Sequence, residues 1–169
     1  MNSSQNELDH RALENFLFNE ARLLSDWKVE QWLENVTPDI SYRVPVRSTL
    51  ESPKEYEPGY SATSFHLLED YGTLKARVQR LATRTAWSET PPSRVRRHIS
   101  CVQSSIAGEG EFYVSSNMLL FWGRDLESVI ISGERQDVIR LVDGCLKLAS
   151  RTLFLDHTVL PLPSIPFLL

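Results

Sequence analysis

The second half of the chain most constrains its fold, because apolar and polar residues alternate there over long stretches. Between about residues 98 and 160 this two-residue period predicts strands with one buried face. Short turns rich in glycine and aspartate separate the stretches, and Asp143-Gly144 is typical of a two-residue hairpin. We therefore expect long antiparallel strands joined by hairpins, with a bulge at Gly133. One predicted buried face consists of Phe112, Val114, Met118, Leu120 and Trp122.

The first third of the chain has a helical period instead. Its apolar residues recur three and four positions apart, which predicts a helix from about Asp9 to Leu24 with one buried stripe. Ser25 or Asp26 can cap a second, short helix, and Thr37-Pro38-Asp39 is expected to end it near residue 36. The stripe of the first helix consists of Leu13, Phe16, Leu17, Ala21, Leu24 and Trp27.

The middle of the chain contains both periods. Alternating residues from Ile40 to Val46 predict a strand over about 39–46. Residues 47–64 fit neither period and are expected to form a long loop. A third helix over about 66–82 follows, because apolar residues recur at steps of four and three. Those residues are Leu67, Tyr71, Leu74, Val78 and Leu81.

These elements together predict one α+β domain over residues 1–169, a length that suits a single core. We expect a strongly curved, mixed but mostly antiparallel sheet, with the three helices of the N-terminal part packed on it. Prolines at 161, 163 and 166 predict an extended tail over 161–169. Because that tail ends in apolar residues, we expect it to dock on this domain or on a neighbouring chain.

Composition argues against several classes of function. The 18 Lys and Arg residues against 22 Asp and Glu residues give a net charge of −4, which argues against a general nucleic-acid binder. No apolar run approaches the roughly 20 residues that a membrane-spanning helix needs, and no secretory signal pattern is visible. With only Cys101 and Cys145 present, a reducing, cytoplasmic setting is the simpler expectation.

Metal and cofactor motifs are missing from the sequence. Two cysteines and four histidines are scattered along the chain, with no C-x-x-C, no H-E-x-x-H and no glycine-rich phosphate loop. His98, Asp156 and His157 could form a two-histidine, one-carboxylate iron site, but a histidine beside an aspartate is more often an ordinary hydrogen-bonded pair. We therefore expect no cofactor-binding or metal-binding residue here, and any cofactor to be held by another chain.

A curved sheet wrapped by helices can also enclose a catalytic pocket, which keeps an alternative function open. A stand-alone isomerase or dehydratase would need an acid, a base or a tyrosine hydroxyl with a shifted pKa in that pocket. A plain binding domain of the same fold is a third alternative. The candidate pocket residues are Asp39, Tyr42, Asp70, His98 and Tyr113.

Two features point to contact with another protein chain. The run Arg94-Val95-Arg96-Arg97 concentrates positive charge, and alternation would place Arg94 and Arg96 on one face and Arg97 on the other. Such arginines either lie in solvent or pair bidentately with carboxylates of a partner. The apolar tail is the second feature. The candidate interface residues are Trp87, Arg94, Arg96, Arg97, Phe167, Leu168 and Leu169.

Stretches from Glu20 to Leu160 resemble, in the same order, the small (beta) subunit of aromatic-ring-hydroxylating dioxygenases. The most specific of them is Ala86-Trp87-Ser-Glu89-x-Pro-Pro92-Ser93-Arg94-x-Arg96. No single stretch is decisive, and their shared order along the chain is what indicates the family. The others are Glu20-Ala-Arg-Leu-Leu24, Trp32-Leu33, Asp39-Ile-Ser-Tyr42-x-x-Pro45-Val-Arg47, Glu69-Asp70-Tyr71, Leu74-Lys-Ala-Arg77-Val78, Arg80-Leu81, Ser116-Asn117 with Arg124, Gly133-Glu-Arg-Gln-Asp137-Val138 and Leu155-Asp156-x-Thr158-Val-Leu160.

The resemblance implies a cystatin-like α+β cone fold, which ketosteroid isomerase and scytalone dehydratase share. It also implies one half of a terminal oxygenase, with three large and three small subunits. In this family the large subunit carries a Rieske [2Fe-2S] cluster and a mononuclear Fe(II), and it cis-dihydroxylates an aromatic hydrocarbon or aromatic acid. Electrons come from NAD(P)H through a reductase and often a ferredoxin. The small subunit is mainly structural, so the arginine run and the tail become candidates for the subunit interface.

Overall fold

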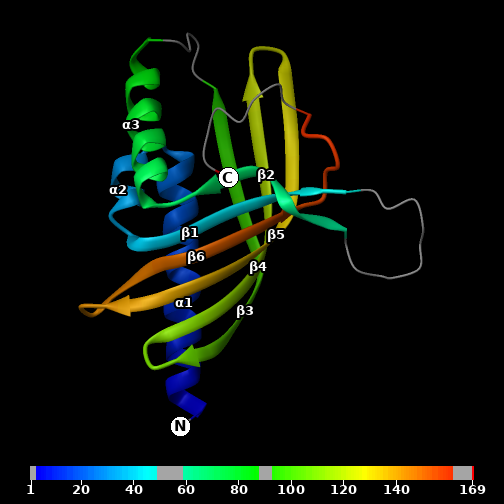
Figure 1. The fold of residues 1–169 in the computed structure, drawn as a ribbon. Coiled ribbons are helices and arrows are strands. Elements are labelled where there is room, and N and C mark those ends of the chain that lie inside the picture. The colour runs from blue at the N-terminus through cyan, green and yellow to red at the C-terminus, as the bar shows by residue number, and fades with distance from the viewer. Residues whose placement is uncertain (1–2, 49–58, 88–92, 162–168) are drawn as a thin grey trace.

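Six strands form one curved sheet in a computed structural model that describes residues 3–48, 59–87, 93–161 and 169. The strand order is β2-β1-β6-β5-β4-β3, and every neighbouring pair is antiparallel except β1 with β6. Figure 1 shows the sheet bending around α1, with α2 and α3 beside β1. The elements are α1 (Ser3–Ser25), α2 (Val29–Leu33), β1 (Val36–Arg47), β2 (Tyr60–Glu69), α3 (Tyr71–Trp87), β3 (Arg94–Gly108), β4 (Glu111–Arg124), β5 (Glu127–Val142) and β6 (Cys145–Leu155).

The predicted α+β class, with its curved, mixed and mostly antiparallel sheet, is confirmed. Leu13 and Leu17 of α1 pack against Val114 of β4 and Ile139 of β5, so the helix stripe meets the inner face of the sheet. Alternation in β4 is also as predicted, because Val114, Met118, Leu120 and Trp122 are all buried. None of the helices in the described ranges is long and apolar enough to cross a membrane.

The boundary between the predicted loop and the third helix was wrong. Residues 60–69 form β2, an edge strand antiparallel to β1, and α3 begins only at Tyr71. Asp70 and Thr73 fix that start, because the Thr73 amide donates to the Asp70 carboxylate (2.8 Å) and the Asp70 amide donates to the Thr73 hydroxyl (2.9 Å). Leu67 is buried from β2, so its helical spacing from Leu74 was a coincidence.

The predicted end of the second helix was also wrong. α2 ends at Leu33, and Thr37-Pro38-Asp39 lies inside β1 rather than before it. The pairing of β1 with β6 is interrupted between Val36 and Ser41. Proline lacks the N–H that a continuous ladder requires, so this interruption is where a strand tolerates it.

The hairpins follow the predicted turn chemistry. Asp143 and Gly144 have φ of 51° and 78°, as a two-residue hairpin turn requires. The strands of this half begin at Arg94 rather than near 98, and the last one ends at Leu155. Gly133 is not a bulge, because β4 and β5 pair in unbroken register there. A Cβ on Gly133 would instead lie 2.5 Å from the carbonyl oxygen of Phe154, so close backbone packing requires glycine.

Candidate functional site

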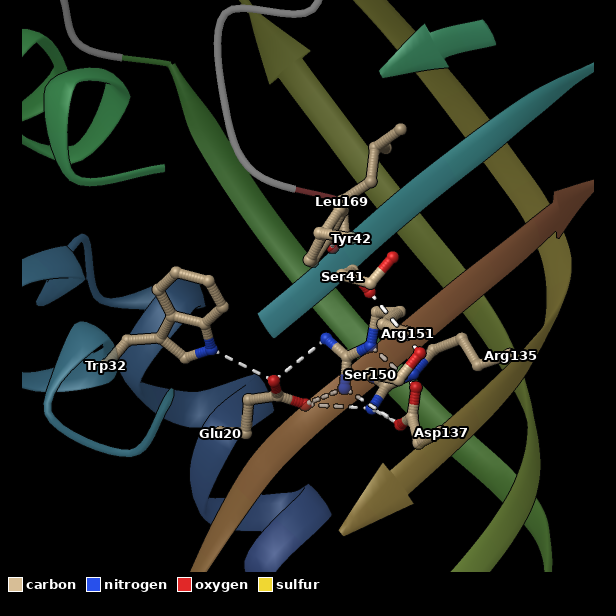
Figure 2. Close-up of polar contacts among 9 residues, drawn as sticks. All are labelled: Glu20, Trp32, Ser41, Tyr42, Arg135, Asp137, Ser150, Arg151 and Leu169. Carbon is tan, nitrogen blue, oxygen red and sulfur yellow. Dashed lines mark hydrogen bonds and ion pairs between the residues drawn. The ribbon is translucent and has the colours of Figure 1, made fainter. Parts of the chain in front are cut away.

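Four charged side chains lie between α1 and the inner face of the sheet. Glu20 comes from α1, Arg135 and Asp137 from β5, and Arg151 from β6, and none is more than 3% exposed. We call these four residues the buried ion cluster. Figure 2 shows their side chains converging from the helix and the two strands. Paired charges therefore lie in the interior of the cone.

Arg151 is the centre of the buried ion cluster. Its two terminal nitrogens each donate to one carboxylate oxygen of Glu20 at 2.8 Å, and its Nε donates to Asp137 at 2.8 Å. Arg135 Nη2 donates to Glu20 at 2.8 Å and to Asp137 at 2.9 Å. Two guanidiniums thus neutralise two carboxylates, and the bidentate geometry offsets the cost of removing these charges from water.

Pairing within the cluster favours the charged forms of Glu20 and Arg151. Burial alone would raise the pKa of Glu20, but the guanidiniums of Arg151 and Arg135 outweigh it and lower the pKa to about 2. Burial would likewise lower the pKa of Arg151, whereas Asp137 and Glu20 hold it above its ordinary value. The pKa values of Glu20 and Arg151 both move away from neutral pH, so these two groups suit a structural role better than acid–base catalysis.

The buried ion cluster connects α1, α2 and Leu169 of the tail to the sheet. Trp32 of α2 donates its indole N–H to Glu20 at 2.9 Å. The guanidinium carbon of Arg151 lies 5.8 Å from the ring centre of Tyr42, whose hydroxyl donates to the main-chain oxygen of Leu169. Leu169 is only 1% exposed, so the end of the tail docks on this chain's own core.

The candidate pocket residues are not brought together. Tyr42 is fully buried and burial raises its pKa. Asp39 is an exposed residue that accepts a hydrogen bond from Arg140 at 2.9 Å, and Asp70 caps α3. His98 and Tyr113 are exposed on the outer face of β3 and β4. Because an acid–base site needs such groups around one substrate, this arrangement does not favour a stand-alone isomerase or dehydratase.

The possible iron ligands are also apart. Asp156 accepts a hydrogen bond from Ser132 at 2.8 Å, while His98 stands on the outer face of β3. Cys101 and Cys145 lie on β3 and β6, which are separated in the sheet by β5 and β4. In residues 3–48, 59–87, 93–161 and 169, no three His, Cys, Asp or Glu side chains are grouped to hold a metal. The donor set described here does not fit a Rieske cluster or a mononuclear iron.

The arginine run lies at the start of β3, and its alternation is confirmed. Arg94 and Arg96 are exposed on the outer face, while Arg97 points inward and is buried. Burial lowers the pKa of Arg97 to about 10, and its main-chain N–H donates to the Ser25 hydroxyl at the end of α1. The side chain of Trp87, and all of Phe167 and Leu168, lie outside the described residues.

Sequence reasoning missed two features. The buried ion cluster was within the family-like stretches, and charged Arg135 and Asp137 at inward positions of a strand were the available signal. The second feature is an outer face with three exposed apolar side chains: Leu119 (41%), Phe121 (37%) and Ile130 (55%). The available signal was that β4 and β5 also carry apolar residues at outward-facing positions. A strand with only one buried face does not need apolar residues there.

Comparison with known proteins matches this architecture. Residues 19–162 match a family model described as ring hydroxylating beta subunit. The chain is 31% identical over 159 residues to the benzene 1,2-dioxygenase subunit beta of Pseudomonas putida, covering 91% of this chain and 84% of the relative. It is also 31% identical over 156 residues to the biphenyl 2,3-dioxygenase subunit beta of Rhodococcus jostii, covering 88% and 82%.

A solved structure shares the fold. A chain of naphthalene 1,2-dioxygenase with indole bound in the active site superposes with a TM-score of 0.83 at 23% identity, covering 97% of this chain and 86% of that one. The curved sheet and its three helices are therefore an arrangement that a dioxygenase chain already uses.

Proposed function

This chain belongs to the family of ring-hydroxylating beta subunits and is the small subunit of an aromatic-ring dioxygenase, and we propose that its role in that enzyme is structural. The observation that carries the proposal is the buried ion cluster, which places two guanidiniums and two carboxylates, paired with one another, in the interior of the cone. A catalytic cone would place unpaired acid–base groups around a cavity there. The catalytic work of the complex then belongs to a different chain.

The partner in this proposal is the large subunit of the terminal oxygenase, in a complex of three large and three small subunits. The large subunit would hold the Rieske [2Fe-2S] cluster and the mononuclear Fe(II), since the donor set described here does not fit them. A reductase, and often a ferredoxin, would deliver electrons from NAD(P)H to the complex. Its reaction would be the cis-dihydroxylation of an aromatic hydrocarbon or aromatic acid. Two exposed free cysteines, Cys101 and Cys145, support a reducing, cytoplasmic setting.

The candidate interface residues divide by burial. Arg94 and Arg96 are proposed as direct contacts because their side chains are exposed. Arg97 and Leu169 are buried in this chain, so in an interface they would act by holding its surface in shape. Trp87, Phe167 and Leu168 stay predictions.

Co-expression tests the proposed function directly. We expect the chain to co-purify with a large subunit, encoded beside it, as a brown, iron-containing complex that oxidises an aromatic substrate. The chain purified alone should be colourless and inactive. Isomerase, dehydratase or oxygenase turnover by the isolated chain, or failure to bind the large subunit, would refute the proposal.

A further inference from the structure

We infer that the outer face of β3, β4 and β5 binds a segment of the large subunit that presents carboxylates beside apolar side chains. We call this surface the outer arginine patch, and it consists of Arg94, Arg96, Leu119, Phe121 and Ile130. The inference rests on the proposed function and adds to it the docking surface and the chemistry of the segment that it recognises.

The strand register places charge and apolar area side by side. Arg96 pairs with Phe121 across β3 and β4, and Phe121 pairs with Ile130 across β4 and β5, so the three lie in one row. Arg94 pairs with Gly123 in the next row on that face. A Cβ on Gly123 would lie 2.9 Å from the Phe121 ring, so the ring leans over the glycine toward the row of Arg94. Both guanidinium side chains therefore flank one aromatic surface.

The two arginines are available for a partner. In the part of the chain that the structure describes, neither Arg94 nor Arg96 has a side-chain hydrogen bond or ion pair, whereas the partly exposed side chains of Arg47 and Arg140 have both. Arg94 and Phe121 line two hollows of about 270 and 240 Å³. Arg96 lines the first of these and a third of about 300 Å³ beside Phe18 of α1. The guanidiniums thus stand between recesses that partner side chains can enter.

The chemistry of the patch selects an acidic segment. Arginine and aromatic residues are enriched in protein interfaces, and a guanidinium pairs bidentately with a carboxylate. Three exposed apolar side chains, 37–55% accessible, add area that is favourable to bury. The chain as a whole is acidic, with a net charge of −4. A general need for solubility therefore does not explain two exposed arginines side by side on one face.

A second copy of this chain related by a two-fold axis is the less suitable occupant. A two-fold contact through the patch would bring Arg94 and Arg96 against the same residues of the other copy. Like charges facing each other across a buried interface disfavour association. A different chain with carboxylates at the matching positions avoids this repulsion, and the large subunit is the partner that the proposed function supplies.

Charge reversal in the complex tests the inference. We expect Arg94→Glu/Arg96→Glu to bind the co-expressed large subunit at least about tenfold more weakly than wild type, as measured by affinity pull-down and size-exclusion chromatography. Arg11→Glu/Arg43→Glu is the matched control, because it changes exposed arginines of α1 and β1 by the same net charge. Phe121→Ser should also weaken binding, whereas Tyr113→Ser, which alters an exposed aromatic of the same strand, should not. Circular dichroism checks folding, and Arg94→Gln/Arg96→Gln replaces the reversal if it fails to fold.

The outcomes separate the inference from the proposed function. If wild type forms no complex with the large subunit, the proposed function is refuted and the inference with it. If wild type assembles and the patch variants assemble equally well, only the inference is refuted. Equal losses in the patch and control variants would also overturn it, since they would show a general effect of charge. If the reversal instead breaks a complex of this chain with its own copies, the occupant is a second copy and the inference is wrong.

Discussion

The buried ion cluster and the outer arginine patch use the same side chain in opposite ways. Inside, Arg135 and Arg151 find both carboxylates that they need within one chain, at 2.8–2.9 Å. Outside, the side chains of Arg94 and Arg96 have no such partners among the described residues, although Phe121 lies beside them on β4. A cluster that completes itself stabilises the fold, whereas an incomplete one can be completed only by another molecule. The first region therefore stabilises the fold, and the second is suited to binding another chain.

The largest expected effect comes from breaking the buried ion cluster at its centre. Arg151→Met keeps an apolar stem but leaves Glu20 and Asp137 short of their shared partner. Removing one partner of a buried ion pair costs about 3–5 kcal/mol, because the remaining charge stays desolvated. We expect urea unfolding to show a loss of that size. The control is Arg43→Met, an exposed arginine of β1, for which we expect a change within about 0.5 kcal/mol. Equal losses would contradict the structural role of the cluster.

Acid should lower the stability of the protein through the buried ion cluster. The pKa of Glu20 falls from 4.5 to about 2 on folding, so its contribution is fully present above pH 4.5 and is lost as the pH falls toward 2. A shift of this size corresponds to a loss on the order of 3 kcal/mol. The free energy of unfolding, measured between pH 6 and pH 2, should therefore fall more steeply in wild type than in Glu20→Gln. The exposed-carboxyl control Glu134→Gln should follow wild type, and identical profiles for all three proteins would count against the charged cluster.

The two regions also differ in how far the sequence predicts them. Alternation placed Val114, Met118 and Leu120 inward and Arg94 and Arg96 outward, because neighbouring residues of a strand point to opposite faces. In the buried ion cluster, Glu20 is 115 and 131 residues from Arg135 and Arg151, a separation that no local period can reveal.

Local patterns failed where tertiary pairing decides the structure. Residues 61–64, all small, lack strand alternation, and they belong to β2 because Tyr60 and Phe65 on either side of them pair with β1. The start of α3, in contrast, was readable from Asp70 and Thr73, whose reciprocal hydrogen bonds depend on sequence spacing alone. The docking chemistry of the outer face was half visible, because Arg94 and Arg96 are two positions apart in sequence while Phe121 joins them only through the β3–β4 register.

A smaller effect is expected where the tail meets the core. Tyr42→Phe removes the hydroxyl that donates to the main-chain oxygen of Leu169 and leaves that oxygen buried without this donor. Losing one partner of a buried hydrogen bond costs about 1–2 kcal/mol. Chemical denaturation should show that loss, and Tyr113→Phe, at an exposed tyrosine of β4, should leave stability unchanged. A neutral Tyr42→Phe would mean that the tail contact adds nothing to the fold.

The smallest stability effect is expected on the outer arginine patch, where stability and assembly should respond differently. Arg94→Ala/Arg96→Ala removes two exposed side chains that have no partner in the described part of the chain, so we expect a stability change within about 0.5 kcal/mol. The same variant should assemble poorly with the large subunit, because the two guanidiniums contribute to binding only when they pair with carboxylates of that subunit. Arg151→Met has the reverse profile, with a large loss of stability whether or not the partner is present. Thermal unfolding of the free chain and size-exclusion chromatography of the complex measure the two properties separately. If the double alanine variant lost stability as Arg151→Met does, its arginines would belong to the fold rather than to an interface.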